Sequence, residues 1–347
     1  MIDLFTPAIV SFLITAFSIP LTIKLAKKYK LLDNPKLRPH PAHTQQRIVP
    51  RAGGLSNFLG IVFAILMFIP LEKYTVGIIT GLSILLVVGL LDDKYKNLSP
   101  YFRLAVQFAV AIIIVLSGIG INFITNPLGG IIYLDPFISD ILAVIWIVWV
   151  MNMLNWSKGV DGQMPGIVTV AAFILGLLSL KINLLDPQQI NVAKIAFITA
   201  ASSFGLLIFN WYPAKIFPGF SGSTILGFMI AVLSILSGAK LATAGLVLLI
   251  PATDFAYTFI RRILQGKSPV WGDRGHLHHK LLEAGFSHRQ ISLFYILGSV
   301  ILGAAALSLS SSGKLFAAIL IATIILGAIL WLNFFGGFLK KSDPDNG

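Results

Sequence analysis

The chain has 347 residues, of which 56% are hydrophobic and 12% are charged, and its mean hydropathy is +0.87. A soluble domain carries about 25% charged residues, so this composition excludes a soluble globular protein and predicts an integral membrane protein. We attribute the formal net charge of +12 to loops beside a membrane, where anionic headgroups and phosphorylated substrates are the expected partners, and not to nucleic-acid binding. The absence of cysteine excludes disulfides, thiol catalysis and cysteine-ligated metal.

About eleven apolar runs follow one another along the chain, and each approaches the roughly 20 residues that cross a bilayer as a helix. They begin near Leu4, Gly54, Thr75, Leu104, Ile138, Ile167, Val192, Thr224, Ala242, Gln290 and Lys314. Long continuous runs exclude the short alternating strands of an outer-membrane barrel. The sequence therefore predicts an all-α, polytopic helical bundle that forms one transmembrane domain over residues 1–335, followed by a polar tail over residues 336–347.

Lysine and arginine gather in the loop after the first run and in the loop after the ninth run. Short cytoplasmic loops hold such an excess, so an odd number of spans places the N-terminus outside and the C-terminus in the cytoplasm. The first run begins MIDLF, with no basic segment before it and no small-residue cleavage site after it, and we expect it to remain in the mature protein. Five polar loops then face the cytoplasm together: the first loop and the segments that contain Asp92, Asn152, Asn210 and His276. Ionisable groups at a membrane edge are costly and functional by default, so we expect these loops to form one active site.

Two adjacent carboxylates, Asp92 and Asp93, end the apolar run SILLVVGLL. Neighbouring carboxylates repel each other unless a cation relieves them. One therefore suits a general base that acts on a phosphate or hydroxyl, and the other suits a cation ligand or an orienting group. The alternative is a solvated stop signal beside Lys94 and Lys96.

The segment NMLNWSKGVDG follows the fifth run. Asn152 and Asn155 are three residues apart and therefore share one helical face, which points their amides into the bundle. Hydrogen bonding between neighbouring helices is the alternative use of such residues in a membrane.

The loop NWYPAKIFPGFSGS precedes the eighth run, whose helix we expect to start near Thr224. Free N–H groups at the start of a helix favour an anion. A lone turn of small residues is a weak signal, however, and an ordinary loop is the alternative.

The segment WGDRGHLHHKLL carries His276, His278 and His279 between Arg274 and Lys280. Their spacing is not the H-E-x-x-H of a zinc protease, so zinc is not expected. Phosphate or sugar oxygens suit these imidazoles better, and a solvated basic loop is the alternative.

Taken in order, these elements resemble the polyprenyl-phosphate N-acetylhexosamine-1-phosphate transferases of the glycosyl transferase family 4 type. They are Asp-Asp at a span end, N-x-x-N followed by V-D-G, P-A-K with G-x-S-G-S, and D-R-G-H-L-H-H-K-L-L. In the first loop, LLDNPKLR and IVPRAGGLSNFLG are similar to the family's D-x-P-x-x-R and P-R-x-G-G elements. The resemblance covers about residues 1–310. It fits the undecaprenyl-phosphate GlcNAc-1-phosphate transferases better than the muramyl-pentapeptide branch, because Leu277 interrupts the histidine run.

The resemblance implies transfer of an N-acetylhexosamine-1-phosphate from a UDP-sugar to polyprenyl phosphate, giving a polyprenyl-diphospho-sugar and UMP at the start of cell-envelope glycan synthesis. It implies a bacterial-type inner membrane, with the active site facing the cytoplasm. The expected partners are the UDP-sugar, polyprenyl phosphate and membrane lipids, with no nucleic acid. The expected cofactor is Mg²⁺, with no zinc and no organic cofactor.

Carried across by motif, the catalytic residues are Asp92, Asp93 and Asp161. Asp161 is also the candidate metal ligand. The residues implied as nucleotide, diphosphate or uridine contacts are Asn155, His276, His278 and His279. By chemistry alone, Arg51 and Arg274 are candidate phosphate clamps, because an arginine fork matches phosphate oxygens.

Two positions depart from the family's usual pattern, and both lose a carboxylate. Where the family usually reads N-x-x-N-x-x-D-G-x-D-G, Lys158 stands in place of the first aspartate. Where it usually reads G-D-S-G-S, Phe220 stands in place of the aspartate expected to ligate magnesium. Such a pocket should hold Mg²⁺ poorly.

Three explanations stay open for these departures. Lys158 replaces the metal as the cation that balances the diphosphate, or Mg²⁺ still enters, bound weakly by the nucleotide phosphates and Asp161. In the third, the chemistry is lost and the protein only binds a lipid phosphate or nucleotide sugar. A simpler alternative has Lys158 extending outward to the headgroups and pairing with nothing.

A transporter of lipid-linked sugars is the alternative of a different class. Transporters usually carry polar groups near the bilayer midplane, whereas the charges here lie on one side of the predicted spans. The main intramembrane acid, Asp254, lies near the cytoplasmic end of its run, where it suits a pocket wall better than a transport path.

Overall fold

A computed structural model gives the structure of residues 3–36, 44, 47–95, 98–127, 129–182, 186–238, 241–268 and 275–335. Arg274 and the tail over residues 336–347 lie outside the described residues. The described part contains thirteen helices and four short strands. The helices are α1 (Phe5–Lys28), α2 (Gly53–Phe68), α3 (Lys73–Tyr95), α4 (Pro100–Leu116), α5 (Pro136–Trp156), α6 (Gln163–Ile182), α7 (Pro187–Asn210), α8 (Gly219–Leu236), α9 (Leu241–Val247), α10 (Leu249–Leu264), α11 (Leu277–Glu283), α12 (His288–Ser308) and α13 (Ser311–Phe335). The antiparallel strand pairs are β1 (Leu32–Asp33) with β2 (Val49–Pro50), and β3 (Phe123–Thr125) with β4 (Ile131–Tyr133).

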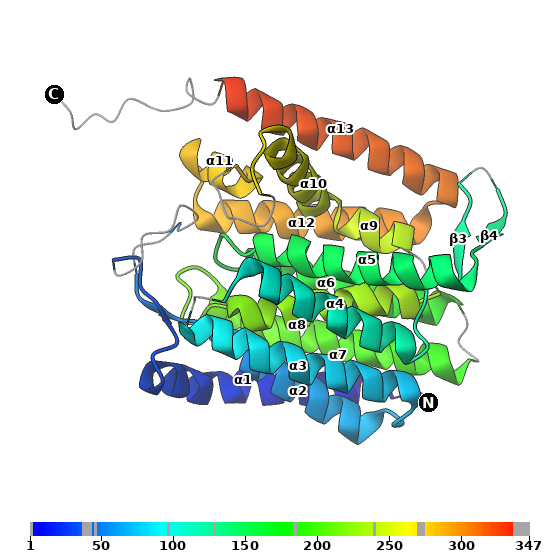
Figure 1. Cartoon of the computed structure of the whole chain (residues 1–347), viewed down its shortest axis with the longest axis horizontal. Coiled ribbons are helices and arrows are strands. Elements are labelled where there is room, and N and C mark those ends of the chain that lie inside the picture. Colours follow the sequence, from blue (N-terminus) through cyan, green and yellow to red (C-terminus); the bar gives the residue numbers. More distant parts are fainter. Residues whose placement is uncertain are drawn as a thin grey trace.

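The apolar runs of the sequence are helices, which confirms the prediction of an all-α polytopic membrane protein. Within the described residues, eight helices are long and apolar enough to cross a membrane: α1, α3, α5, α6, α7, α8, α12 and α13. Helices α2 and α4 are shorter, with 16 and 17 residues. The long helices lie roughly side by side, and their ends form two faces of the molecule (Figure 1).

The ninth apolar run is not the single straight span that hydropathy predicts. It is broken into α9 and α10, which meet at an angle of 85°. Helix α10 buries its polar residues Asp254 and Arg262, while Ile260 and Leu264 are exposed. A helix with a polar face held against protein and an apolar face turned outward is suited to a membrane interface rather than to crossing the bilayer.

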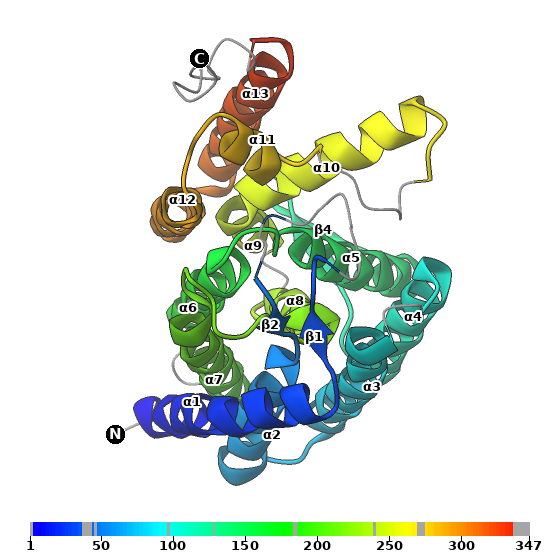
Figure 2. The ribbon, with the colours of Figure 1, turned by 90° about the vertical axis from the view of Figure 1, so that its left-hand side faces the viewer.

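Helix α8 lies at the centre of the bundle. Figure 2 looks along it, with α1 to α7 around it and α9 to α13 grouped on one side. Of the residues in its spanning segment, 94% are buried. Helices α2, α3, α5, α6 and α7 pack against it. The residues at its start are therefore held by several helices at once.

Hydrogen bonds between small polar side chains join α1, α2 and α7 inside the bundle. The hydroxyls of Thr22 and Ser56 are 2.8 Å apart, those of Thr15 and Ser202 are 2.9 Å apart, and Asn57 Nδ2 donates to Ser202 Oγ at 2.8 Å. Such contacts hold helices together in a medium that offers no hydrogen-bonding solvent.

Three helix starts follow directly from local sequence. Ser99, Asp135 and Asp186 each precede a proline, and each side chain accepts a hydrogen bond from the backbone N–H two residues later. Serine and aspartate are favoured caps, and proline suits the first helical position because it has no N–H to leave unpaired. These caps fix the starts of α4, α5 and α7.

The polar segments gather at the end of the bundle that lies on the left of Figure 1 and faces the viewer in Figure 2. The end of α3, the turn from α5 to α6, the loop from α7 to α8, the hairpin β1–β2 and α11 all lie there. The hairpin is tied to the α7–α8 loop, because Phe217 N donates to Pro50 O and Gly53 N donates to Phe217 O. Helix α1 starts at the opposite end and α13 ends at this one (Figure 1), as an odd number of spans requires. Which face is cytoplasmic stays a prediction.

Candidate active site

Asp93 caps the start of α8 from a distant part of the chain. Its Oδ1 accepts hydrogen bonds from Phe220 N at 2.7 Å and Arg51 Nε at 2.9 Å. Its Oδ2 accepts hydrogen bonds from Ser221 N at 3.1 Å and Ser221 Oγ at 2.7 Å. Gly219 has a φ of +74°, and a Cβ there would lie 2.3 Å from Asp93 Oδ2, so the carboxylate fills the space beside this glycine.

This arrangement corrects two sequence interpretations. Helix α8 starts at Gly219 and not near Thr224, so GFSGS is its first turn and not a loop in front of it. The start of α8 does attract an anion, as expected of free N–H groups, and the anion is the Asp93 side chain. The pair at the end of α3 is not a solvated stop signal, because Asp92 is 3% exposed and Asp93 is fully buried.

Asp92 has a looser environment than Asp93. Arg103 NH1, from α4, lies 3.4 Å from both of its carboxylate oxygens. These contacts are at the long end of hydrogen-bond geometry. Asp92 therefore keeps more capacity to accept a further hydrogen bond than Asp93, whose oxygens have four donors.

Lys158 points into the bundle, so the interpretation in which it extends to the lipid headgroups is wrong. Its Nζ donates to Asn155 Oδ1 at 2.6 Å, to Gly219 O at 3.1 Å and to Ser223 Oγ at 3.1 Å. Ser223 Oγ also donates to Asn155 Oδ1 at 2.8 Å. The turn after α5 and the first turn of α8 are thus joined through one ammonium group.

The ring of Phe220 lies near two cations. Its centre is 5.8 Å from Lys158 Nζ and 5.1 Å from the guanidinium carbon of Arg103. Both distances are within the range of cation–π attraction. The pKa of Lys158 is lowered to about 7, first by burial and then by the nearby Arg51 charge, against the opposing effect of Asp93 and Asp92.

The two asparagines of N-x-x-N have different uses. Asn152 Nδ2 donates to Gln107 Oε1 of α4 at 2.6 Å, which is the interhelical bond that the sequence offered as an alternative. Asn155 instead contacts Lys158 and Ser223 in the polar cluster.

Asp161 ties loops together at the same end of the bundle. Its Oδ2 accepts from Arg47 NH2 at 3.0 Å and from Ala214 N at 2.9 Å. Its backbone oxygen accepts from Ser292 Oγ at 2.5 Å. These contacts join the α5–α6 turn to the first loop, to the α7–α8 loop and to α12.

The three histidines are buried at α11, so they do not form a solvated basic loop. Asp254 Oδ2 lies 3.1 Å from His276 Nδ1, and Asp254 Oδ1 accepts from Leu277 N at 2.8 Å. The rings of His276 and His278 stack, 5.5 Å apart at 6°. Burial and the neighbouring histidines hold the pKa of His278 well below its usual range, so this ring is neutral at pH 7.

Gly159 brings the histidines to Lys158. A Cβ at Gly159 would lie 2.0 Å from His278 Nε2, so the imidazole packs directly on the backbone beside Lys158. Any larger residue at position 159 would push the histidine helix away from the turn that carries the lysine.

Three ion pairs of this end, those made by arginines with Asp161, Asp93 and Asp92, share one pattern: the carboxylate is buried and the cation is accessible. The exposed fractions of the side chains are 41% and 3% for Arg47 and Asp161, 22% and 0% for Arg51 and Asp93, and 27% and 4% for Arg103 and Asp92. Lys158 is also partly accessible. The accessible surface of the site is therefore cationic, which favours an anionic ligand.

Several residues of the site were not predicted from the sequence. They are Asp33, Arg47, Arg103, Ser221, Ser223 and Asp254 as the partner of His276. Arg103 carried a usable signal, since it is a charge near the start of an otherwise apolar run. Asp33 pairs with Arg51 at 3.9 Å and lies in the D-x-P-x-x-R element, so two first-loop elements meet through these residues.

The residues present do not fit a resident Mg²⁺ at the position of Lys158. The oxygens of Asn155, Gly219 and Ser223 hold the ammonium at 2.6 to 3.1 Å. Magnesium requires oxygens at about 2.0 to 2.1 Å, and the ring of Phe220 supplies no oxygen. Among the described residues, no group of three or more His, Cys, Asp or Glu side chains is placed to hold a metal ion.

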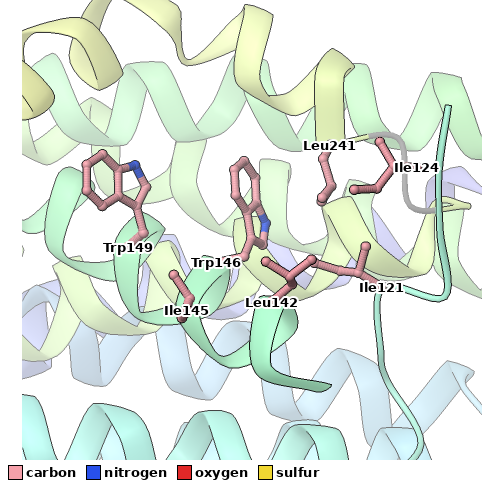
Figure 3. A pocket seen from close by; sticks show the side chains of 7 residues that line it. All are labelled: Ile121, Ile124, Leu142, Ile145, Trp146, Trp149 and Leu241. Carbon is pink, nitrogen blue, oxygen red and sulfur yellow. The ribbon is translucent and has the colours of Figure 1, made fainter. Parts of the chain in front are cut away.

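An apolar groove of about 340 Å³ opens along α5. Its lining residues are Ile121, Ile124, Leu142, Ile145, Trp146, Trp149 and Leu241 (Figure 3). Trp149 packs against Phe255, Phe255 packs against Trp156, and Trp156 packs against His276, with ring centres 4.6, 4.6 and 5.2 Å apart. Aromatic side chains thus connect the groove to the histidines.

The fold and the site define a multi-pass membrane protein with a cationic site at one end of its bundle and an apolar groove along α5. The sequence profile of "Glycosyl transferase family 4" matches residues 75–238. The chain is 32% identical over 344 residues to the "Probable undecaprenyl-phosphate N-acetylglucosaminyl 1-phosphate transferase" of Bacillus subtilis, covering 96% of this chain and 88% of the relative. This chain belongs to glycosyl transferase family 4, which confirms the resemblance predicted from its motifs.

Two further relatives agree. The "Decaprenyl-phosphate N-acetylglucosaminephosphotransferase" of Mycobacterium leprae is 31% identical, over 91% of this chain and 86% of the relative. The "Undecaprenyl-phosphate alpha-N-acetylglucosaminyl 1-phosphate transferase" of Escherichia coli K12 is 28% identical, over 86% of this chain and 81% of the relative.

Proposed function

We propose that this protein is an enzyme that transfers N-acetylhexosamine-1-phosphate from a UDP-sugar to polyprenyl phosphate, releasing UMP and starting the synthesis of a cell-envelope glycan. The relatives are named as enzymes that transfer N-acetylglucosamine phosphate to undecaprenyl or decaprenyl phosphate. The observation that carries the proposal is the cationic surface over buried carboxylates at one end of the bundle, with aromatic side chains leading to it from an apolar groove along α5. Both substrates need such a place, because one is a lipid with a phosphate head and the other is a diphosphate.

The cations of the site balance the charge of the reacting phosphates. A phosphate monoester carries about −1.5 to −2 charge at pH 7, so a lipid phosphate beside a nucleotide diphosphate needs several positive groups. Arg51, Arg103 and Lys158 supply three, and arginine forks hold phosphate oxygens through paired hydrogen bonds. Positioning and charge balance are the main needs of phosphoryl transfer.

The two adjacent aspartates take different roles in this proposal. An oxygen of the lipid phosphate attacks the sugar-linked phosphorus, a new P–O bond forms, and the bond to the bridging oxygen breaks as UMP leaves with the electron pair. Asp92, with its looser contacts, accepts or orients a proton of the attacking phosphate. Asp93, with four donors, positions Arg51 and the first turn of α8.

The other predicted site residues surround the sugar nucleotide. His276 and His278 offer ring nitrogens to the diphosphate or uridine, with His276 oriented by Asp254. His278 acts as a neutral hydrogen-bonding group, because its pKa is lowered by burial. Asp161 holds Arg47 and the loops that shape this end. His279 packs on His278, with ring centres 4.3 Å apart, and supports it.

The groove along α5 suits the prenyl chain. Its lining is apolar, and Trp149 lies seven residues before Trp156 on α5, about 10 Å along the axis at the helical rise. A chain in the groove would bring its phosphate head toward the cationic end. This end faces the cytoplasm of a bacterial-type inner membrane in the proposal, which agrees with the basic loops.

The test uses purified protein in detergent with polyprenyl phosphate and UDP-N-acetylglucosamine, and follows both UMP release and the lipid-linked product by mass spectrometry. We expect equal amounts of the two products and their loss in Asp92→Asn. Uptake of a lipid-linked sugar into sealed vesicles without UMP release would instead support a transporter. Binding of UDP-sugar with no product from any UDP-sugar would mean that the chemistry has been lost.

A further inference from the structure

Lys158 differs from the other cations of the site in its partners. Arg47, Arg51 and Arg103 each pair with a carboxylate. Lys158 donates to an amide oxygen, a backbone oxygen and a hydroxyl, and no ion pair found among the described residues includes it. Its positive charge is therefore the one in this cluster that lacks a carboxylate partner, and a phosphate can compensate it.

The ammonium is held in one place. An ammonium has three protons, and the three acceptors of Lys158 come from α5, the first residue of α8 and the hydroxyl of Ser223. Ser223 Oγ lies within hydrogen-bond distance of both Asn155 Oδ1 and Gly219 O. A cation held by the start of the most buried helix does not need to be reorganised when a substrate arrives, which is the condition for strong electrostatic stabilisation.

Phe220 preserves the positive potential of this point. Its ring lies near both Lys158 and Arg103 and carries no formal charge. A carboxylate at position 220 would pair with these cations and cancel part of the charge that an incoming phosphate meets. The lysine and the phenylalanine are thus complementary: one supplies a fixed cation and the other leaves it uncompensated.

We propose that Lys158 is the resident cation of the reaction centre, where its ammonium contacts the diphosphate of the sugar nucleotide and balances its charge in place of a bound divalent metal ion. The inference rests on the proposed transferase function and specifies how the same site works. A diphosphate bound beside Lys158 favours the charged form of the amine, so Lys158 holds its proton while the nucleotide is bound. It stabilises the charge on the phosphate oxygens as the P–O bond to the bridging oxygen breaks and UMP leaves.

The first arm of the experiment measures UMP release by the wild-type protein with excess EDTA and with added Mg²⁺. We expect release in EDTA at a rate close to that with Mg²⁺. Lys158→Met keeps the length of the side chain and removes its charge, and we expect roughly a 100-fold lower kcat in EDTA, the effect of removing one preorganised donor. Lys158→Arg, which keeps the charge, should retain more activity than Lys158→Met. Lys94→Met, a change of an exposed lysine at the end of α3, is the matched control.

The second arm measures binding of UDP by calorimetry in EDTA, which does not depend on turnover. Loss of a charge-assisted hydrogen bond should lower the affinity of Lys158→Met for UDP by about tenfold or more. Lys94→Met should bind UDP with the affinity of the wild type. The double variant Lys158→Asp/Phe220→Asp should bind UDP only when Mg²⁺ or Mn²⁺ is added. Thermal melting of each variant separates loss of folding from loss of binding.

The outcomes distinguish this inference from the proposed function. UMP release by the wild type that EDTA abolishes keeps the transferase and overturns the role of Lys158. Equal UDP affinity and equal activity of Lys158→Met and the wild type also overturn it. UDP binding in EDTA that depends on Lys158, with no UMP release under any condition, supports the cation site and refutes the transferase. If Lys158→Met does not fold, the EDTA test on the wild type decides alone.

Discussion

Asp93 and Ser221 are 128 positions apart, yet one oxygen of the Asp93 carboxylate accepts hydrogen bonds from both the backbone N–H and the hydroxyl of Ser221, at 3.1 and 2.7 Å. The contact caps α8 with a side chain from α3. The end of α3 and the start of the central helix are therefore one unit, and the cationic surface is built around it.

This contact predicts that substitution of Asp93 lowers stability, whereas substitution of Asp92 lowers activity. Asp93→Ala removes the cap and leaves Arg51 without its closest partner, at a cost of about 2 kcal/mol or more. We expect the melting temperature to fall by several degrees. Asp92→Ala should keep most of the stability and lose activity. Thermal melting beside UMP release tests this, with Asp140→Ala as an exposed control; equal melting temperatures for the two variants would contradict it.

The lowered pKa of Lys158 predicts a dependence of stability on pH. The pKa is about 7 in the folded protein and near the usual lysine value of 10.5 in the unfolded chain. Between about pH 7 and 10 the unfolded state therefore binds more protons, so the contribution of Lys158 to stability becomes more favourable as pH rises. Below pH 7 the amine is charged in both states, so the full free-energy cost of burying the ammonium opposes folding.

Comparing the wild type with Lys158→Met isolates this effect from the other titrating groups. We expect the variant to be more stable than the wild type at pH 6 to 7, with the difference shrinking toward pH 10. Melting of both proteins across this range is the measurement. A constant difference at all pH values would show that the folded-state pKa is close to that of the free side chain.

Asp254 and His276 are predicted to act as a unit. Asp254→Asn and His276→Ala should each weaken UDP binding, and the double variant should be little weaker than either single one, because the contact at 3.1 Å is lost in all three. A coupling energy of about 1 kcal/mol or more is expected from the double-mutant cycle. Additive effects would mean that Asp254 does not orient the imidazole. Asp140→Asn is the control.

If the prenyl chain lies in the groove, a substitution in the groove lining should affect only long lipid acceptors. Ile145→Ser removes apolar surface from the lining and should raise KM for a long polyprenyl phosphate by about tenfold, from the loss of roughly 1 to 2 kcal/mol of apolar contact. A short acceptor that cannot reach the groove should be unaffected. Ile141→Ser is the matched control, because Ile141 is also exposed on α5 and lies outside the lining. Equal KM values for Ile145→Ser and Ile141→Ser would place the chain elsewhere.

The helices were predictable because their signals are local. Continuous apolar runs identify helices in a membrane, and the pairs Ser99-Pro100, Asp135-Pro136 and Asp186-Pro187 mark three helix starts. The bend between α9 and α10 was not predictable from hydropathy, which averages over the window and does not register that the polar residues of α10 share one face. The early start of α8 was missed for a related reason: its cap is a side chain from α3.

The sequence identified which residues belong to the site, but not which of them contact one another. The motifs named Asp92, Asp93, Asn155, Lys158, Asp161 and the histidines, and the structure brings them to one end of the bundle. The sequence did not show that Asp93 is saturated with donors while Asp92 is not, since the two residues are adjacent and chemically identical. That difference arises because a helix turns about 100° per residue, so neighbours face different surroundings.

By itself, the sequence determined the class of protein, the helices and the chemistry gathered in the polar segments, because each depends on composition, on hydropathy over one helix length or on short motifs. Only the tertiary structure decided what each polar group meets. It placed Asp93 on the start of α8, paired Arg47, Arg51 and Arg103 with buried carboxylates, and held Lys158 among neutral oxygens. The physical reason is that the electrostatics of a buried charge depend on its neighbours in space, and here those neighbours come from helices and loops far apart in the chain.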